Sequence, residues 1–383
     1  MSVRVEVNPD LLVWARDRAG LDAERVAKVA PKFDAWLSGD TKPTLKQLEK
    51  FAAATFAPLG YLLLDAPPEE PLPVTDFRTF AGAAPTRPSP NLLDTIYACE
   101  QRQEWYRTYA LQEQFDPVPF IGMFTTATEI ATAAAAIAET LDFAVEDRSR
   151  YSSWTAALSG LTERAEASGV LVMINGVVGA NTHRKLDPYE FRGFCLVDDL
   201  APVVFINGAD TKAAQIFTLA HEIAHLWIGA SGVSNATLAE TAGDATEQWC
   251  NRVAAELLVP AAALSNVALD REHLTAVLDT LAKHFRVSTL VVLRRLKDTG
   301  RLTGAQFRSA YEGELERVLA LKGEAGSGGN FYNTQPVRVS KHFAAALISS
   351  TIEGVTLHRD AFRLLGVKSV ATFNELGHRL GVL

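Results

Sequence analysis

The chain has 383 residues, of which 48% are hydrophobic and 21% charged, and its formal net charge at pH 7 is −8. This length allows two or three domains with separate cores, and the negative balance argues against a protein that coats nucleic acid non-specifically. No apolar run approaches the roughly 20 residues that cross a bilayer, and the first residues lack the pattern of a secretion signal, so we expect a cytoplasmic protein without membrane contact.

The first 65 residues have the pattern of an all-α domain. Asp22 is placed to cap a short helix that Pro31 ends, and Leu45, Leu48 and Phe51 recur at helical spacing further on. The proline-rich segment 66–90 then indicates an extended linker that runs over the surface, because proline fixes φ and cannot donate a backbone hydrogen bond.

The remaining chain predicts a domain at residues 91–322 and a helical extension at residues 323–383. Helical pattern dominates, but three short β-rich runs lie at residues 169–174, 194–197 and 202–206. Each run is bounded by Gly, Asn, Asp or Pro, and together they should form a small mixed sheet just before a helix. The fold class is therefore α+β and mostly helical.

The three cysteines predict buried thiols. Cys99, Cys195 and Cys250 are odd in number, widely separated and embedded in apolar sequence. A disulfide framework or a Cys-rich metal site would show closer and paired spacing.

The strongest functional signal is the run His221-Glu222-Ile223-Ala224-His225. Residues four apart in a helix lie about 40° apart around its axis, so His221 and His225 project side by side and can share one metal ion. Glu222 lies beside them, close enough to act on a bound water, as in zinc peptidases. The surrounding residues predict a buried helix, and a metal ion supplies the partner that these buried polar groups need.

A catalytic zinc ion needs three protein ligands, and the third is expected downstream. The segment 244–260 has the pattern of one helix in which Glu247 and Glu256 lie on opposite faces. Glu256 has Arg252 one turn back, as in a solvent-exposed ion pair, whereas the face of Glu247 is small and apolar. We therefore predict Glu247 as the third ligand, with Asp244 as the main alternative.

This ligand set predicts hydrolysis of a peptide bond. Zinc lowers the pKa of its bound water to about 7 and polarises the carbonyl under attack. Glu222 is predicted to take the proton of that water and to deliver it to the leaving amine. A further donor should stabilise the oxyanion, and four candidates remain open: His183, Tyr189, Arg192 and His284.

Two stretches resemble motifs of the ImmA/IrrE family of metallopeptidases. Residues 217–226 read Phe-Thr-Leu-Ala-His-Glu-Ile-Ala-His-Leu, and residues 247–260 read Glu-x-x-Cys-Asn-x-x-Ala-Ala-Glu-Leu-Leu-Val-Pro. Cys250, Val253 and Val259 stand where the family usually has Ala, Phe and Met, and none of them is a predicted ligand. In that family the first glutamate of the second motif completes the zinc site, which supports Glu247.

The resemblance extends beyond the peptidase motifs. Residues 1–65 are similar to the XRE-like helix-turn-helix modules fused to one branch of the family. Other stretches look like the linker, the following helix and the C-terminal extension of that branch: residues 76–79, 102–106, 328–334 and 361–367. The resemblance implies a zincin-like core of the gluzincin type, in a bacterial or phage endopeptidase that acts on a regulator in stress response or mobile-element control.

The N-terminal module has two interpretations. In a helix-turn-helix, residues 23–29 would be the first helix and residues 32–37 the recognition helix, which reads DNA with side chains near its start. This second helix is short, and positive and negative charges are nearly balanced over the module, although a small basic face around Lys28 and Lys32 could contact DNA. The alternative is a module that forms a homodimer or grips the substrate.

The sequence thus predicts a zinc endopeptidase that cleaves a partner protein, a transcriptional repressor or another regulator. The alternative from a different class is a DNA-binding regulator or partner-binding module, in which the zinc fold senses a partner without cleaving it. A third possibility is that the protein neutralises or activates a partner encoded by a neighbouring gene.

Overall fold

The computed structural model describes residues 3–78, 87–234, 244–265, 267–321 and 331–383. Two compact units divide the chain by its internal contacts: Met1–Pro73 with Thr86–Ile96, and Val74–Pro85 with Tyr97–Leu383. Residues 79–86 of the predicted linker, the predicted boundary at residue 322 and residues 328–330 of the 328–334 motif lie outside the described residues.

The first unit is built from short helices around its own core. Asp22 accepts a hydrogen bond from the Arg25 backbone at 2.8 Å and caps the second helix as predicted. Phe33 and Trp36 of the third helix pack against Phe51 of the fourth, with ring centroids 5.5 and 6.3 Å apart. The elements of this part are α1 (Pro9–Arg18), α2 (Ala23–Val29), α3 (Phe33–Leu37), α4 (Leu45–Thr55) and η1 (Leu59–Leu63).

The second unit contains the mixed sheet and most of the helices. Its strands are β1 (Thr75–Asp76), β2 (Leu171–Asn175), β3 (Val177–Val178), β4 (Asn181–Lys185), β5 (Gly193–Leu196), β6 (Val203–Asn207) and β7 (Gly232–Ser234). Its helices begin with α5 (Pro90–Gln112), within which the division between the units falls. The others are α6 (Ile130–Thr140), α7 (Val145–Arg148), α8 (Trp154–Ala167), α9 (Lys212–Ile228), α10 (Ala245–Leu258), α11 (Ala261–Leu264), α12 (Leu274–Phe285), α13 (Thr289–Asp298), α14 (Gly304–Leu321), α15 (Phe331–Val339), α16 (Lys341–Ile352), α17 (His358–Leu365) and α18 (Val370–Leu380).

The main sheet has five strands in the order β1-β7-β5-β6-β2. Strand β5 runs antiparallel to both β6 and β7, whereas β2 is parallel to β6 and β1 is parallel to β7. The three predicted β-rich runs are confirmed as β2, β5 and β6, whose residues are almost wholly buried. The sequence did not predict β1, β7 or the β3–β4 hairpin. Strands β1, β3 and β7 have only two or three residues and show no readable alternation, and β4 is polar and mostly exposed.

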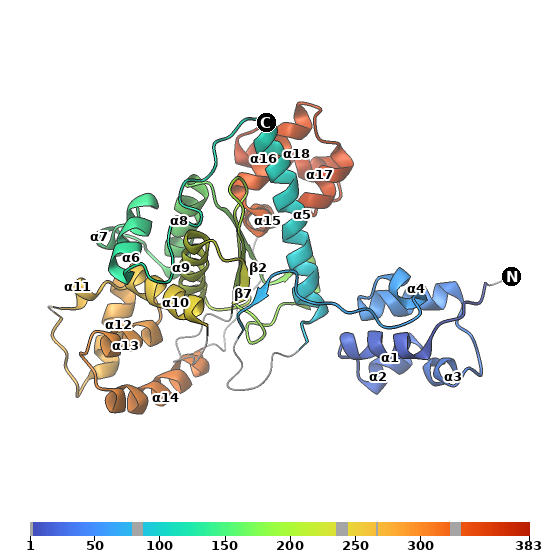
Figure 1. The fold of residues 1–383 in the computed structure, drawn as a ribbon, viewed down its shortest axis with the longest axis horizontal. Coiled ribbons are helices and arrows are strands. Elements are labelled where there is room, and N and C mark those ends of the chain that lie inside the picture. Colours follow the sequence, from blue (N-terminus) through green and yellow to red (C-terminus); the bar gives the residue numbers. More distant parts are fainter. Residues whose placement is uncertain (1–2, 79–86, 235–243, 266, 322–330) are drawn as a thin grey trace. The chain divides into compact units, whose positions relative to one another are not determined.

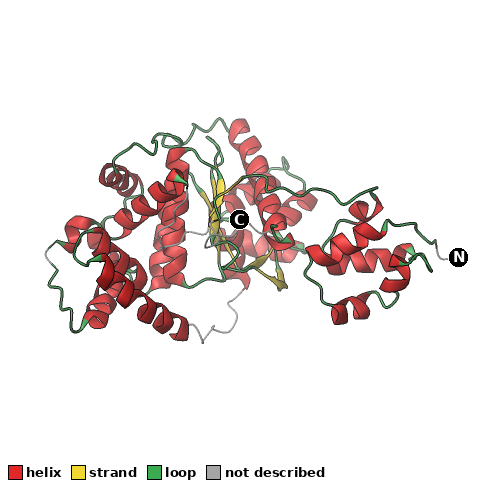
Figure 2. Ribbon diagram, turned by 60° about the horizontal axis from the view of Figure 1, so that its bottom comes forward, coloured by secondary structure: helices red, strands yellow, loops and turns green. Residues whose placement is uncertain are grey.

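Helices cover both faces of the sheet (Figure 1). Helices α8 and α9 pack on one face, and α15 and α16 pack on the other side of β2. Seen with the bottom of the molecule turned forward, the strands form a thin layer between helices (Figure 2). Such a covered sheet explains why β2, β5 and β6 are apolar almost throughout rather than alternating. Among the described residues, no helix has both the length and the apolar character that a bilayer span requires.

The linker prediction is wrong for residues 74–78. Thr75 and Asp76 form β1 and pair with Gly232 and Val233 at the edge of the sheet, so this stretch belongs to the sheet and is not a linker. The side chain of Arg78 is fully buried, and its Nη2 lies 2.7 Å from Asp76 Oδ2. The paired backbone and the buried ion pair hold this stretch in the fold. Its proline-rich surroundings do not predict these contacts. The three cysteines are buried free thiols, as predicted.

Arg148 fixes the end of α10. Its side chain lies among the largest fully buried ones, and its guanidinium donates to the carbonyl oxygens of Leu258 and, at 2.6 Å, Leu257. These carbonyls terminate the helix and have no partner within it. Burial lowers the pKa of Arg148 to about 10, so the group still carries its charge at neutral pH, next to the negative end of the helix dipole.

We expect Arg148→Met to lower the free energy of unfolding by about 2–4 kcal/mol, because buried carbonyls lose charged donors. Arg150→Met is the matched control. The Arg150 side chain is 80% exposed and pairs with Asp147, and its replacement should cost less than about 0.5 kcal/mol. Urea denaturation of both variants measures the difference, and equal losses would contradict this role of Arg148.

Candidate metal centre

Helix α9 carries the first two candidate ligands through the core. Thr211 caps its start by accepting from the Ala214 backbone, and Gly229 ends it at a φ of 71°, which a residue without a side chain adopts most easily. Every residue from 215 to 227 is buried. His221, Glu222 and His225 are therefore presented in a water-excluded interior, as the apolar sequence around them predicts.

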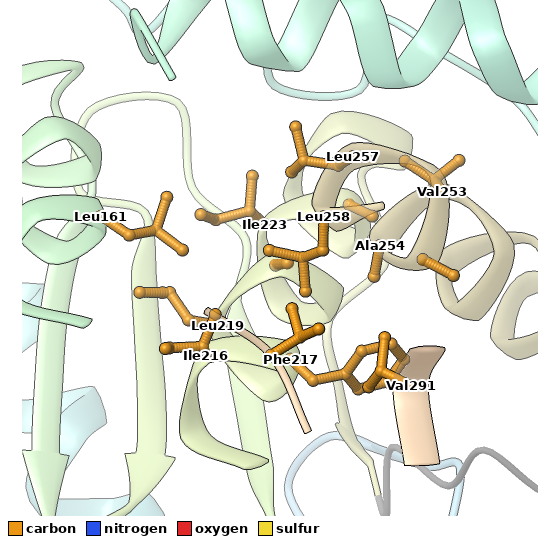
Figure 3. Close-up of a cluster of buried hydrophobic side chains, with 14 of the residues drawn as sticks. Leu161, Ile216, Phe217, Leu219, Ile223, Val253, Ala254, Leu257, Leu258 and Val291 are labelled. Carbon is orange, nitrogen blue, oxygen red and sulfur yellow. The ribbon is translucent and has the colours of Figure 1, made fainter. Parts of the chain in front are cut away.

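Helix α10 brings the third candidate to the same place. Its apolar face packs against α9, and Figure 3 shows Ile223 of α9 in the same buried cluster as Leu257 and Leu258 of α10. Ala220, Ala224 and Ala254 are each completely buried, and side chains this small allow the helices to approach closely. The packing directs Glu247, in the first turn of α10, towards the two histidines.

The candidate ligand atoms form a compact cluster. The Nε2 atoms of His221 and His225 are 3.0 Å apart. Glu247 Oε1 lies 2.9 Å from His225 Nε2, and its Oε2 lies 3.4 Å from His221 Nε2. The three side chains are 0%, 1% and 7% exposed, respectively. The structure thus brings together the three residues that the sequence singled out as ligands.

The cluster fits a tetrahedral metal ion. Bonds of about 2.0–2.2 Å from one ion place neighbouring ligand atoms roughly 3.3 Å apart, close to the separations found here. The two imidazoles face each other through Nε2, and neither has a hydrogen-bond partner at Nδ1 among the described residues. The buried Nε2 atoms lie against each other and against the Glu247 carboxylate, and a shared cation would bind all three groups.

Glu222 lies beside the cluster and is held by β7. The Ser234 hydroxyl donates to Oε1 of Glu222, whereas Oε2 has no hydrogen-bond partner in the described part of the chain. Burial raises the pKa of Glu222 to about 8, against a smaller lowering by His225. Burial would also raise the pKa of Glu247, but the adjacent His221 and His225 lower it to about 2. The pKa values of the two carboxyl groups are therefore shifted in opposite directions.

Glycine on β5 makes room for the Glu222 carboxylate. A Cβ on Gly193 would lie 2.9 Å from Glu222 Oε1, 2.6 Å from Thr218 Cγ2 and 2.9 Å from the Phe205 carbonyl oxygen. A backbone oxygen cannot move aside as a flexible side chain can. The position and direction of the Glu222 carboxylate thus depend on the missing side chain at residue 193.

The alternatives to Glu247 lie elsewhere. Asp244 is the N-cap of α10 and accepts from the Thr246 backbone at 2.7 Å, so its carboxylate serves the helix end. The predicted exposed pair of Glu256 with Arg252 is wrong. Glu256 pairs instead with Arg295 of α13, and its side chain is only 14% exposed. Arg295 reaches Glu256 from α13, a contact between distant segments that the local i, i+4 pattern does not reveal.

The structure does not assign the oxyanion donor. His183 and Tyr189 are exposed, and His284 is exposed on α12. Arg192 precedes β5, with its Nε 3.7 Å from Asp210 Oδ2. The choice among the four stays a prediction.

Sequence reasoning missed several neighbours of the cluster. Ser234, Gly193 and the buried Cys195 thiol surround Glu222, and the ring of Phe77 stacks on the His225 imidazole at a centroid distance of 5.4 Å. Phe77 was noted only as part of a linker motif. An aromatic residue between two proline-rich stretches indicates a segment that packs against the protein. Phe77 gave this signal in the sequence.

Comparison with known families matches two parts of the chain. Residues 165–297 match the family model Peptidase_M78, described as the IrrE N-terminal-like domain. This match supports the ImmA/IrrE family for a region that includes α9 and α10, and it indicates a metallopeptidase. Residues 339–379, which include α16 to α18, match a domain of unknown function (DUF8813). Searches of curated proteins and of solved structures gave no significant match.

We expect Gly193→Ala to lower the free energy of unfolding by about 1–3 kcal/mol, because the added methyl group must displace Thr218 and the Glu222 carboxylate. Gly313→Ala is the control, since a Cβ there meets nothing within 4 Å and helix propensity favours alanine. Thermal or urea unfolding compares the two variants. A Gly193→Ala protein as stable as the control would show that the site is loosely packed.

Proposed function

We propose that the protein is a zinc-dependent endopeptidase with His221, His225 and Glu247 as metal ligands and Glu222 as the general base. The observation that carries this proposal is the buried convergence of two imidazoles and a carboxylate, with a second carboxylate beside them. The family match over residues 165–297 supports the same reaction class. The donor set of two His and one Glu is one that zinc uses in hydrolytic sites.

The side chains divide the work of hydrolysis between them. A zinc ion held here would acidify a water molecule and polarise the peptide carbonyl. Glu222 accepts the proton of the attacking water at its free Oε2 and later delivers it to the leaving amine. Ser234 holds the other carboxylate oxygen and so keeps Oε2 directed. A pKa raised by burial suits a group that must take and return a proton, and a cation nearby would lower it again.

The proposed substrate is another protein, a transcriptional repressor or similar regulator, and residues 1–65 are proposed as an XRE-like helix-turn-helix module. Helices α2 (Ala23–Val29) and α3 (Phe33–Leu37) support this assignment, because a short turn joins them as in a helix-turn-helix. In α3, Phe33 and Trp36 are buried in the core of the unit. The exposed Asp34 of α3 and the exposed Lys32, which directly precedes the helix, carry opposite charges. These features favour a module that holds a protein partner over one that reads DNA bases.

We expect Glu247→Gln to weaken zinc binding by at least about 100-fold, because the variant loses an anionic ligand. Glu256→Gln is the matched control on the opposite face of α10 and should bind zinc like the unaltered protein. Competition with a chromophoric chelator measures both affinities. Equal zinc affinity in the two variants would remove Glu247 from the ligand set.

We expect Glu222→Gln to retain zinc but to lower the rate of cleavage by about 10²–10⁴-fold, because the amide cannot accept the proton. The measurement is mass spectrometry of fragments from the purified product of the neighbouring gene and from a peptide library. Unreduced cleavage by the zinc-loaded variant would show that the base is another group. Regulation in the cell that survives this substitution would favour the alternative function, a sensor that binds without cleaving.

A further inference from the structure

The edge of the sheet next to the metal centre is occupied by the chain's own residues 75–77. Strand β1 pairs in parallel with β7, and the Phe77 amide donates to the Val233 carbonyl oxygen at 3.0 Å. The Phe77 ring then stacks on His225 with an interplanar angle of 29°. Strand β7 is also the strand whose Ser234 holds Glu222. One short backbone segment thus contacts both the scaffold of the general base and a candidate ligand.

The candidate centre is closed in this arrangement. His221 and Glu222 are completely buried, and the other two side chains are at most 7% exposed. An extended peptide must place its carbonyl next to these groups for hydrolysis to occur. Phe77 lies directly against His225 and contributes to the closure. A peptide that approaches from the β7 edge therefore has to take the place of Phe77.

The place of the Phe77 ring is shaped for an aromatic side chain. A Cβ on Gly232 would lie 2.3 Å from two carbon atoms of the ring, so a side chain at residue 232 would exclude it. Gly232 and the flat face of His225 both border the ring and together form a slot that it fills. A large planar side chain gains most from such a slot, because stacked rings are preferred at these distances.

The pairing of β1 with β7 is short. The strand has two residues, and a strand this short contributes few backbone hydrogen bonds. The segment is retained by ion pairs of Arg78, whose Nη1 lies 3.5 Å from Glu190 Oε1 and whose Nη2 lies 2.7 Å from Asp76. Addition of a strand to an exposed edge is a common way of binding peptides, and the affinity comes from such backbone bonds.

We propose that β1 and Phe77 are a resident ligand of the peptide-binding edge, which a substrate segment displaces by pairing with β7 and placing an aromatic side chain between Gly232 and His225. This inference rests on the proposed function and names the substrate class, an extended segment with an aromatic residue. The peptidase site is accordingly held closed in cis until such a segment exchanges with residues 75–77.

The test uses the full chain without added metal and a fluorescein-labelled pentapeptide, Val-Thr-Asp-Phe-Arg, which copies residues 74–78. We expect Phe77→Ala to bind this probe at least about 10-fold more tightly than the unaltered protein in fluorescence anisotropy, because its own ring no longer competes. Phe115→Ala, which removes a ring that is 46% exposed, is the control and should bind like the unaltered protein. The same peptide with Ala in place of Phe should bind none of the proteins.

Two further measurements identify the place where the probe binds. Adding Gly232→Ala to Phe77→Ala should abolish the gain, because its Cβ fills the slot, whereas adding Gly313→Ala should preserve it. In the unaltered protein, excess peptide should increase hydrogen exchange at the Phe77 amide. This measurement does not depend on the folding of a variant. A Phe77→Ala protein without tighter binding, a gain that survives Gly232→Ala, or an unchanged Phe77 amide would each overturn the proposal.

The outcomes separate this inference from the proposed function. Peptide binding is measured without zinc and without cleavage, so its failure leaves the metal site and Glu222 untouched. Conversely, the protein could bind the peptide as expected but neither hold zinc nor cleave. The edge would then still be a peptide-binding surface, but the protein would not be a peptidase.

Discussion

Four ionisable side chains lie close together in the buried interior. Most of the surrounding structure holds these side chains in position. His221, Glu222 and His225 come from one buried helix, and Glu247 comes from its neighbour. Charges and polar groups in such a place are costly unless they are paired or bound to a metal. Because burying these groups without a partner is unfavourable, the fold must either bind an ion here or hold the four side chains rigidly in place.

Several features outside the cluster meet this requirement. The small residues between α9 and α10 set the distance between the helices and hence the distance between ligands. Arg148 holds the far end of α10, and Gly193 and Ser234 position the Glu222 carboxylate from two strands of the sheet. Each of these residues contacts a backbone or a side chain that the cluster depends on. Rigid support of this kind is what a preorganised site needs, because loose ligands lose affinity and rate.

The sequence was informative where a signal is local and repeated. Helical periodicity placed His221 and His225 on one face and Glu247 and Glu256 on opposite faces of the next helix, and three apolar runs predicted the strands β2, β5 and β6. It failed where a contact joins distant segments. Glu256 and Arg295 are 39 residues apart, and β1 pairs with a strand more than 150 residues away. A two-residue strand has no periodicity of its own, so only the fold could place Thr75 and Asp76 in the sheet.

The position of β1 in the chain has a consequence for the concentration of substrate that the proposed exchange requires. A segment tethered by a short stretch of the same chain acts at an effective concentration of millimolar order, above that of most free proteins. A substrate therefore has to outcompete a neighbour that never diffuses away, and weakly matching peptides would be left uncut. Val74 directly follows Pro73, the last residue of one part of the first unit. A partner that binds that unit and pulls residues 74–77 away from β7 would lower the effective concentration of this segment at the edge. A lower concentration of substrate would then be enough for cleavage.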